Sequence, residues 1–152
     1  MPKDGYFLRA ESFFNVATQI ERLDEEFEGI PRISGAYGKR ALHEQSHGES
    51  FLALMTNRFR GNGLYVLDEP EAALSPSRQM AVISRIHDLV QAESQFIIAT
   101  HSPIIMAYPN STIYQLSDEG IDAVEYTDTE HYAVARGFLN NPQRMLDILM
   151  NE

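Results

Sequence analysis

Two apolar segments that each end in polar residues constrain the fold of this chain most. Leu64 to Leu67 is a continuous apolar run followed by the sequence DEPE at residues 68–71. Phe96 to Thr100 is a second such segment, and His101 follows it directly. An apolar run without polar alternation is typical of a strand covered on both faces in a parallel sheet. The two segments therefore predict two buried, neighbouring strands.

A helix is predicted between these strands. Ser75 and Pro76 form a typical helix start, with an N-cap hydroxyl followed by proline at the first helical position. The residues with helical spacing that predict its apolar face are Met80, Val82, Ile83, Ile86, Leu89 and Val90. Strand, helix and strand in this order form a βαβ unit. We therefore expect an α/β fold with a parallel sheet flanked by helices.

The remaining elements are predicted from similar local patterns. We expect a strand at Tyr6–Arg9, helices at 11–27 and 49–59 with a loop at 28–42 between them, a hairpin at 112–116 and 121–126, and helices at 128–139 and 142–150. A chain of 152 residues has the size of one domain. Within that domain (residues 1–152) we distinguish a helical region at 5–60, the βαβ core with the hairpin at 61–126, and terminal helices at 127–152.

Composition narrows the classes of protein that this chain can represent. It has no cysteine, which excludes disulfides and thiolate metal sites. Its 22 acidic and 12 Lys and Arg residues give a formal net charge of -10, which does not favour nucleic-acid binding. The sequence contains neither a secretory signal nor an apolar run long enough to span a bilayer. We therefore expect a cytoplasmic protein.

The polar residues that follow the two strands suit phosphoanhydride hydrolysis. In open α/β sheets, ligands bind beyond the carboxyl ends of the strands. There, Asp68 could hold a Mg²⁺ ion, Glu69 could deprotonate an attacking water, and His101 could donate to the terminal phosphate. The simpler alternative is that Asp68 and Glu69 only begin a loop and His101 caps the next helix. The joint pattern on one βαβ unit favours the catalytic interpretation.

These motifs resemble those of ATP-binding cassette ATPases. GLYVLDEPE at 63–71 resembles a Walker B motif with its catalytic glutamate, and ATHSP at 99–103 resembles an H-loop. Leu74 and Ser75 stand where the D-loop of that family falls, although Ser75 replaces the usual aspartate. The resemblance is closest to the soluble, AAA-like branch of predicted ATPases. It implies a P-loop NTPase-type fold, ATP and Mg²⁺ as cofactors, Asp68 as metal ligand and Glu69 and His101 as catalytic residues.

A divergent signature motif precedes the predicted helix at 49–59. QSHGES at 45–50 resembles LSGGQ, with His47 in place of a glycine and Glu49 in place of the glutamine. The resemblance implies that Ser46, Gly48 and Glu49 contact nucleotide held by the opposite subunit of a head-to-tail dimer. A free helix N-terminus suits such an anion. No glutamine stands at the expected Q-loop, where Glu11 is the candidate substitute.

The sequence has no phosphate-binding loop of the form GxxxxGK[ST]. The nearest match, Gly38 with Lys39, has Arg40 where serine or threonine is required. We therefore expect the N-terminal Walker A portion of the domain to be missing. The chain alone would bind ATP weakly or not at all, and an apolar face of the sheet would be exposed. A second copy, or a chain that supplies the P-loop, would be its partner.

Two alternatives remain open. The chain could be a noncatalytic assembly or binding module derived from such an ATPase. His43-Glu44-Gln45-Ser46-His47 also matches HExxH, in which two histidines on a helix bind zinc and the glutamate activates water. Gly48 and the glycine-containing loop upstream disfavour the helix that a zinc metalloprotease needs. Of the other histidines, His87 and His131 are expected to be ordinary solvated residues.

Overall fold

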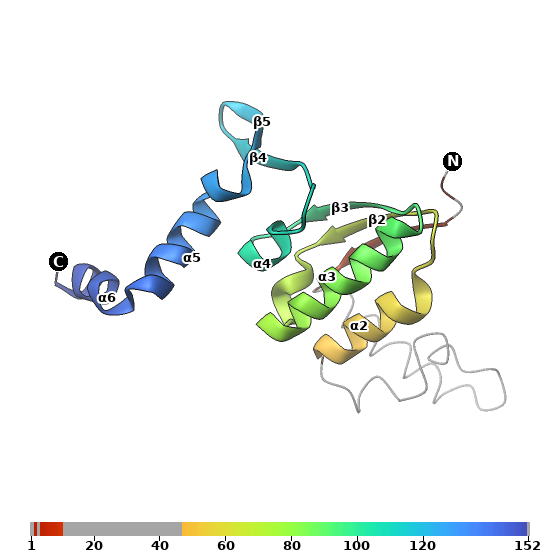
Figure 1. Cartoon of the computed structure of the whole chain (residues 1–152), viewed down its shortest axis with the longest axis horizontal. Coiled ribbons are helices and arrows are strands. Elements are labelled where there is room, and N and C mark those ends of the chain that lie inside the picture. Colours follow the sequence, from red (N-terminus) through yellow and green to blue (C-terminus); the bar gives the residue numbers. More distant parts are fainter. Residues whose placement is uncertain (1, 3, 11–46, 152) are drawn as a thin grey trace. The chain divides into compact units, whose positions relative to one another are not determined.

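The chain folds into two compact units, Met1–Thr100 and His101–Glu152. The computed structural model describes residues 2, 4–10 and 47–151 (Figure 1). The first unit contains β1 (Asp4–Arg9), α2 (His47–Arg58), β2 (Gly63–Asp68), the 3-10 helix η3 (Pro70–Ala73), α3 (Pro76–Gln91) and β3 (Gln95–Ala99). The predicted segments at 11–27 and 28–42 lie outside the described residues.

A parallel three-stranded sheet with the order β1-β2-β3 forms the centre of the first unit. Its register places Phe7, Val66 and Ile97 in one row across the sheet, and Arg9, Asp68 and Ala99 in another. Because the strands are parallel, their carboxyl ends lie at the same edge. The predicted α/β fold with a parallel sheet and packed helices is confirmed.

Helices α2 and α3 lie side by side on one face of this sheet (Figure 1). The ring of Phe59, just after α2, stacks on the buried ring of Tyr65 with centroids 4.2 Å apart. The buried apolar residues of this core are Leu8, Ala10, Phe51, Leu54, Met55, Phe59, Tyr65, Leu67, Leu74, Val82, Ile86 and Leu89. The strands and both helices thus share one hydrophobic core.

The opposite face of the sheet is open among the described residues. Phe7 is 68% exposed and Ile97 is 54% exposed, while Val66 between them is half-buried. The prediction of strands covered on both faces was therefore wrong for the described part of the chain, because α2 and α3 cover one face only. The predicted exposure of an apolar sheet face is confirmed.

The turn before β2 is fixed by a buried tyrosine. The phenol oxygen of Tyr65 accepts from the N–H of Arg60 at 2.6 Å and donates to its carbonyl oxygen at 2.7 Å. Burial raises the pKa of this phenol above its ordinary value. A Cβ atom on Gly63 would stand 2.5 Å from the Tyr65 hydroxyl, so glycine is required there. These contacts set where β2 begins.

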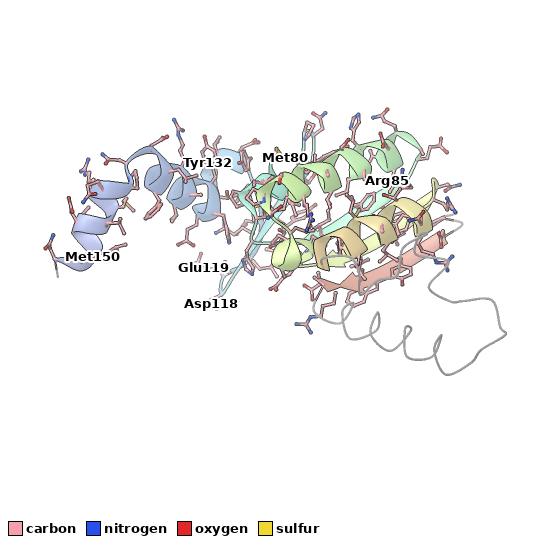
Figure 2. All side chains as sticks on the ribbon, turned by 90° about the horizontal axis from the view of Figure 1, so that it is seen from below. Met80, Arg85, Asp118, Glu119, Tyr132 and Met150 are labelled. Atoms are coloured by element: carbon pink, nitrogen blue, oxygen red, sulfur yellow. The ribbon has the colours of Figure 1, made fainter. Side chains whose placement is uncertain are left out.

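Arg85 of α3 holds the carboxyl end of α2. Its guanidinium donates to the carbonyl oxygen of Met55 at 3.3 Å and to that of Phe59 at 3.1 Å (Figure 2). The last carbonyls of a helix have no partner within the helix and carry partial negative charge, so a cation stabilises them. This contact fixes α2 against α3.

Helix α3 begins as predicted, but its buried face differs in two residues. Ser75 is the N-cap, and its hydroxyl accepts from the N–H of Arg78 at 3.4 Å. Met80, predicted on the apolar face, is 59% exposed (Figure 2). Gln79 is buried instead, because its side-chain amide donates to the carbonyl oxygen of Leu74 at 3.1 Å and is thereby satisfied.

The second unit combines short helices with a hairpin. It contains α4 (Pro103–Met106), β4 (Ile113–Ser117), β5 (Gly120–Val124), the 3-10 helix η4 (Tyr126–Asp128), α5 (Glu130–Asn140) and α6 (Pro142–Met150). Strands β4 and β5 pair antiparallel, and Asp118 and Glu119 form the tip between them (Figure 2). The predicted hairpin and terminal helices are confirmed. Among the described helices, none has the length and apolar character needed to cross a bilayer.

Candidate active site

Asp68 ends β2 at the carboxyl edge of the sheet, as the sequence predicted. Its neighbour in register is Arg9, the last residue of β1. The Nε atom of Arg9 lies 3.2 Å from Oδ2 of Asp68, with side chains 55% and 32% exposed. Such a solvated ion pair contributes little stability. It does orient the carboxylate at the sheet edge, and sequence patterns gave no sign of this partner.

Glu69 turns the chain out of the strand in a strained conformation. Its backbone is left-handed, with φ 48° and ψ 52°, which is uncommon for a residue other than glycine. Its N–H donates to the carbonyl oxygen of Ala99 at 2.9 Å, so the turn is tied to the end of β3. The side chain of Glu69 does not cap η3. Strain of this kind tends to be retained at functional sites.

Glu71 and Thr100 link the segments that follow β2 and β3. The hydroxyl of Thr100, just after β3, donates to Oε2 of Glu71 at 2.7 Å. Both side chains are half-buried. The strand-end pattern indicated that polar residues would meet at this edge, but it could not tell which carboxylate would bind the threonine.

The residues at the predicted D-loop connect η3 to α3. Leu74 is buried at 7% exposure, and its carbonyl oxygen accepts from Gln79. Ser75 is exposed, and its hydroxyl lies 3.2 Å from that of Ser77. The predicted N-cap at Ser75 is confirmed. Contact of either residue with nucleotide stays a prediction.

His101 is the first residue of the second unit. Its Nδ1 atom lies 3.1 Å from Nε2 of His131, in the first turn of α5, and the ring centroids are 5.3 Å apart. His131 is half-buried, so the prediction that it is an ordinary solvated residue was wrong. Ser102, not His101, caps α4, because its hydroxyl accepts from the N–H groups of Ile104 and Ile105. The helix-cap alternative for His101 is therefore excluded.

The predicted signature motif is described only in part. Gly48 and Glu49 belong to the first turn of α2, which begins at His47. Ser46 lies outside the described residues, as do His43 and Glu44 of the HExxH motif and the Q-loop candidate Glu11. Contact of this motif with nucleotide and the zinc alternative therefore stay predictions.

The described carboxylates suit Mg²⁺ better than a metal held by protein alone. Among the described residues, no group of three or more His, Cys, Asp or Glu side chains converges on one point. Mg²⁺ is commonly bound by one or two carboxylates together with waters and substrate phosphates. Asp68 offers such a carboxylate at an exposed edge, with Arg9 on one of its oxygens. The donor set therefore fits a Mg²⁺ ion that arrives with a nucleotide.

The geometry first defines a class, an α/β domain whose parallel strands carry an acidic site at their carboxyl edge. Residues 49–106, which include the Walker B-like and H-loop-like sequences, match the family model of the AAA ATPase domain. The resemblance of these motifs to those of ATPases is therefore confirmed over this segment. No curated protein matches the chain. A solved structure from work on "ATP-driven dimerization and DNA stimulated activation of SMC ATPases" is 18% identical, with 88% of this chain and 97% of that chain covered and a TM-score of 0.45.

Proposed function

We propose that the chain takes part in ATP binding and Mg²⁺-dependent ATP hydrolysis as one element of a dimeric ATPase. The observation that carries this proposal is the left-handed turn at Glu69, which is tied to Ala99 and stands directly after Asp68. The turn keeps a carboxylate at the carboxyl edge of the sheet although the conformation is unfavourable for glutamate. The ATPase-domain match over residues 49–106 includes both acidic residues.

The proposed roles follow from the chemistry of each group. Asp68 would hold Mg²⁺ directly or through water, and this ion would neutralise charge on the phosphate oxygens. Glu69 would orient and deprotonate the attacking water. His101 would donate a hydrogen bond to the γ-phosphate. Gly48 and Glu49, together with Ser46, would contact nucleotide from the opposite subunit, and Leu74 with Ser75 would form the D-loop.

Arg9 gives Asp68 a second partner that the metal must accommodate. Its guanidinium and Mg²⁺ would both be drawn to the same carboxylate. The ion pair is solvated, so opening it costs little. Asp68 would therefore be available as a ligand for Mg²⁺ with Arg9 still beside it.

Replacing Glu69 with glutamine tests this function. We expect Glu69→Gln to lower ATP turnover by about 10²-fold to 10⁴-fold, because glutamine keeps the shape but cannot accept the proton. Turnover should be measured with the partner that supplies a P-loop, and also with the chain alone. Glu93→Gln is the matched control, because Glu93 is also left-handed, with φ 63°, but lies in the turn before β3. Equal turnover in Glu69→Gln and wild type would refute the proposal.

A noncatalytic assembly module is the second candidate. It is favoured by Phe7 and Ile97, which are exposed on either side of the half-buried Val66 on the sheet face that is open among the described residues. Such a row suits a surface that is covered by another chain. A module of this kind would assemble in the same way with Glu69→Gln as without it, and neither form would turn over ATP.

A further inference from the structure

The pair formed by His101 and His131 requires one particular arrangement of protons. A hydrogen bond between two ring nitrogens needs one N–H and one lone pair. The 3.1 Å distance joins Nδ1 of His101 to Nε2 of His131, so one shared proton lies between these two atoms when both rings are neutral. The identity of the donor ring then fixes the tautomer of both histidines.

The two possible proton arrangements differ in free energy. If His131 donates, both rings carry their proton on Nε2, which is the favoured position for a neutral histidine side chain in water. If His101 donates, both rings must carry it on Nδ1, which is the less favoured position. The first arrangement also leaves an N–H at the far nitrogen of His101, whereas the second leaves a lone pair there.

The anchoring of His131 makes it suitable as a fixed partner. It lies in the first turn of α5, whose N-cap Thr129 is buried. The hydroxyl of Thr129 accepts from the N–H of Tyr132 at 3.3 Å and donates to the carbonyl oxygen of Tyr126 at 2.8 Å. The hydroxyl of Tyr126 in turn donates to the carbonyl oxygen of Pro103, two residues after His101. The helix start and the chain after His101 are thereby joined within one unit.

We propose that His131 is a positioning residue that donates its Nε2–H to Nδ1 of His101, and so keeps the proton of His101 on Nε2. The significance for catalysis rests on the proposed function, in which His101 meets the γ-phosphate. Phosphate oxygens are acceptors, so only a protonated Nε2 can bond to them. His131 thus selects the tautomer that the reaction needs without touching the nucleotide.

The tautomers can be measured directly without nucleotide. We suggest long-range ¹H–¹⁵N correlation spectra of the imidazole nitrogens in the full ¹⁵N-labelled chain, at about pH 8.5, where histidine is ordinarily neutral. EDTA should be present to remove adventitious metal. We expect a single tautomer at His101, protonated on Nε2. His101→Gln assigns its signals, and His87 on α3 of the first unit serves as an internal reference.

Two substitutions at His131 separate its donor role from its bulk. His131→Phe keeps a ring but cannot donate, and we expect His101 to become a mixture of both tautomers. His131→Gln places an amide N–H near the original Nε2 position and should retain the single tautomer. Unchanged His87 signals would show that the first unit remains folded in each variant.

Three results would overturn the proposal. They are a proton on Nδ1 of wild-type His101, an unchanged tautomer in His131→Phe, or a change in both histidine signals on metal removal, which would indicate a shared metal ion. None of these depends on ATP turnover. If Glu69→Gln and wild type turn over ATP equally while His101 shows the expected tautomer, the proposed catalytic role of His101 is refuted. The hydrogen bond between the two histidines would still stand.

Discussion

The two units of this chain differ most in how they bury apolar side chains. Twelve of the thirteen buried apolar residues in the described part of the chain belong to the first unit, and only Ile105 belongs to the second. In the second unit, exposed apolar residues include Leu116 at 75%, Leu139 at 76% and Leu149 at 68%. The first unit, which has its own core, holds the left-handed backbone of Glu69, whereas the second unit is ordered mainly by helix caps and local hydrogen bonds.

Alanine substitutions at Phe59 and Phe138 should show the largest difference in stability between the two units. Phe59 is fully buried and contacts the rings of Tyr65 and Tyr6. We expect Phe59→Ala to reduce the free energy of unfolding by about 3–5 kcal/mol, because it leaves a cavity in the core. Phe138→Ala, in α5 with the ring 36% exposed, should cost less than about 1 kcal/mol. Chemical denaturation measures both losses of stability. Equal losses would show that Phe138 is packed as firmly as Phe59.

Alanine substitutions at Gly63 and Gly137 should change stability in opposite directions and by smaller amounts. Gly63→Ala forces a Cβ atom against Tyr65 and should destabilise the first unit by about 1–3 kcal/mol. Gly137, within α5, has open space where a Cβ would lie. Gly137→Ala should therefore stabilise that helix by about 0.5–1 kcal/mol. Stabilisation by Gly63→Ala in thermal unfolding would show that the packing around Tyr65 adapts.

Relief of the backbone strain at Glu69 should give the smallest change in stability. Glu69→Gly is expected to raise the free energy of unfolding by about 0.5–1 kcal/mol, because glycine adopts φ 48° without a Cβ clash. Asn110 in the second unit has φ 60°, but asparagine tolerates this region. Asn110→Gly should therefore change stability less than Glu69→Gly. A loss of stability in Glu69→Gly would mean that the glutamate side chain contributes more than its backbone costs.

Local signals in the sequence were sufficient for most of the described fold. The strand predicted at Leu64 to Leu67 is observed at Gly63–Asp68, and the proline-marked helix begins at Pro76. The N-cap at Ser75 and the hairpin were also predicted correctly. Each of these features depends on residues that are close together in the chain. Examples are a cap hydroxyl with the N–H that it accepts from, and an apolar run with the polar residues that end it.

Most of the contacts that the sequence did not reveal join residues that are distant in the chain. Gln79 is an exception, because the carbonyl oxygen that accepts its amide belongs to Leu74, five residues earlier, whereas the hydrophobic pattern favoured Met80 as the buried residue. Arg9 with Asp68, Glu71 with Thr100 and His101 with His131 are each set by tertiary geometry. The sequence predicted a common sheet edge only for the residues around Glu71 and Thr100, and it could not assign which side chains bond there.

The nucleotide that remains bound after mixing with Mg²⁺-ATP shows whether Glu69 acts as the general base. It should be determined for wild type and Glu69→Gln, each in the proposed complex with a chain that supplies a P-loop. We expect Glu69→Gln to retain intact ATP, whereas wild type converts its bound ATP to ADP. Equal conversion of ATP by both forms would contradict the assignment of Glu69 as the general base at this sheet edge.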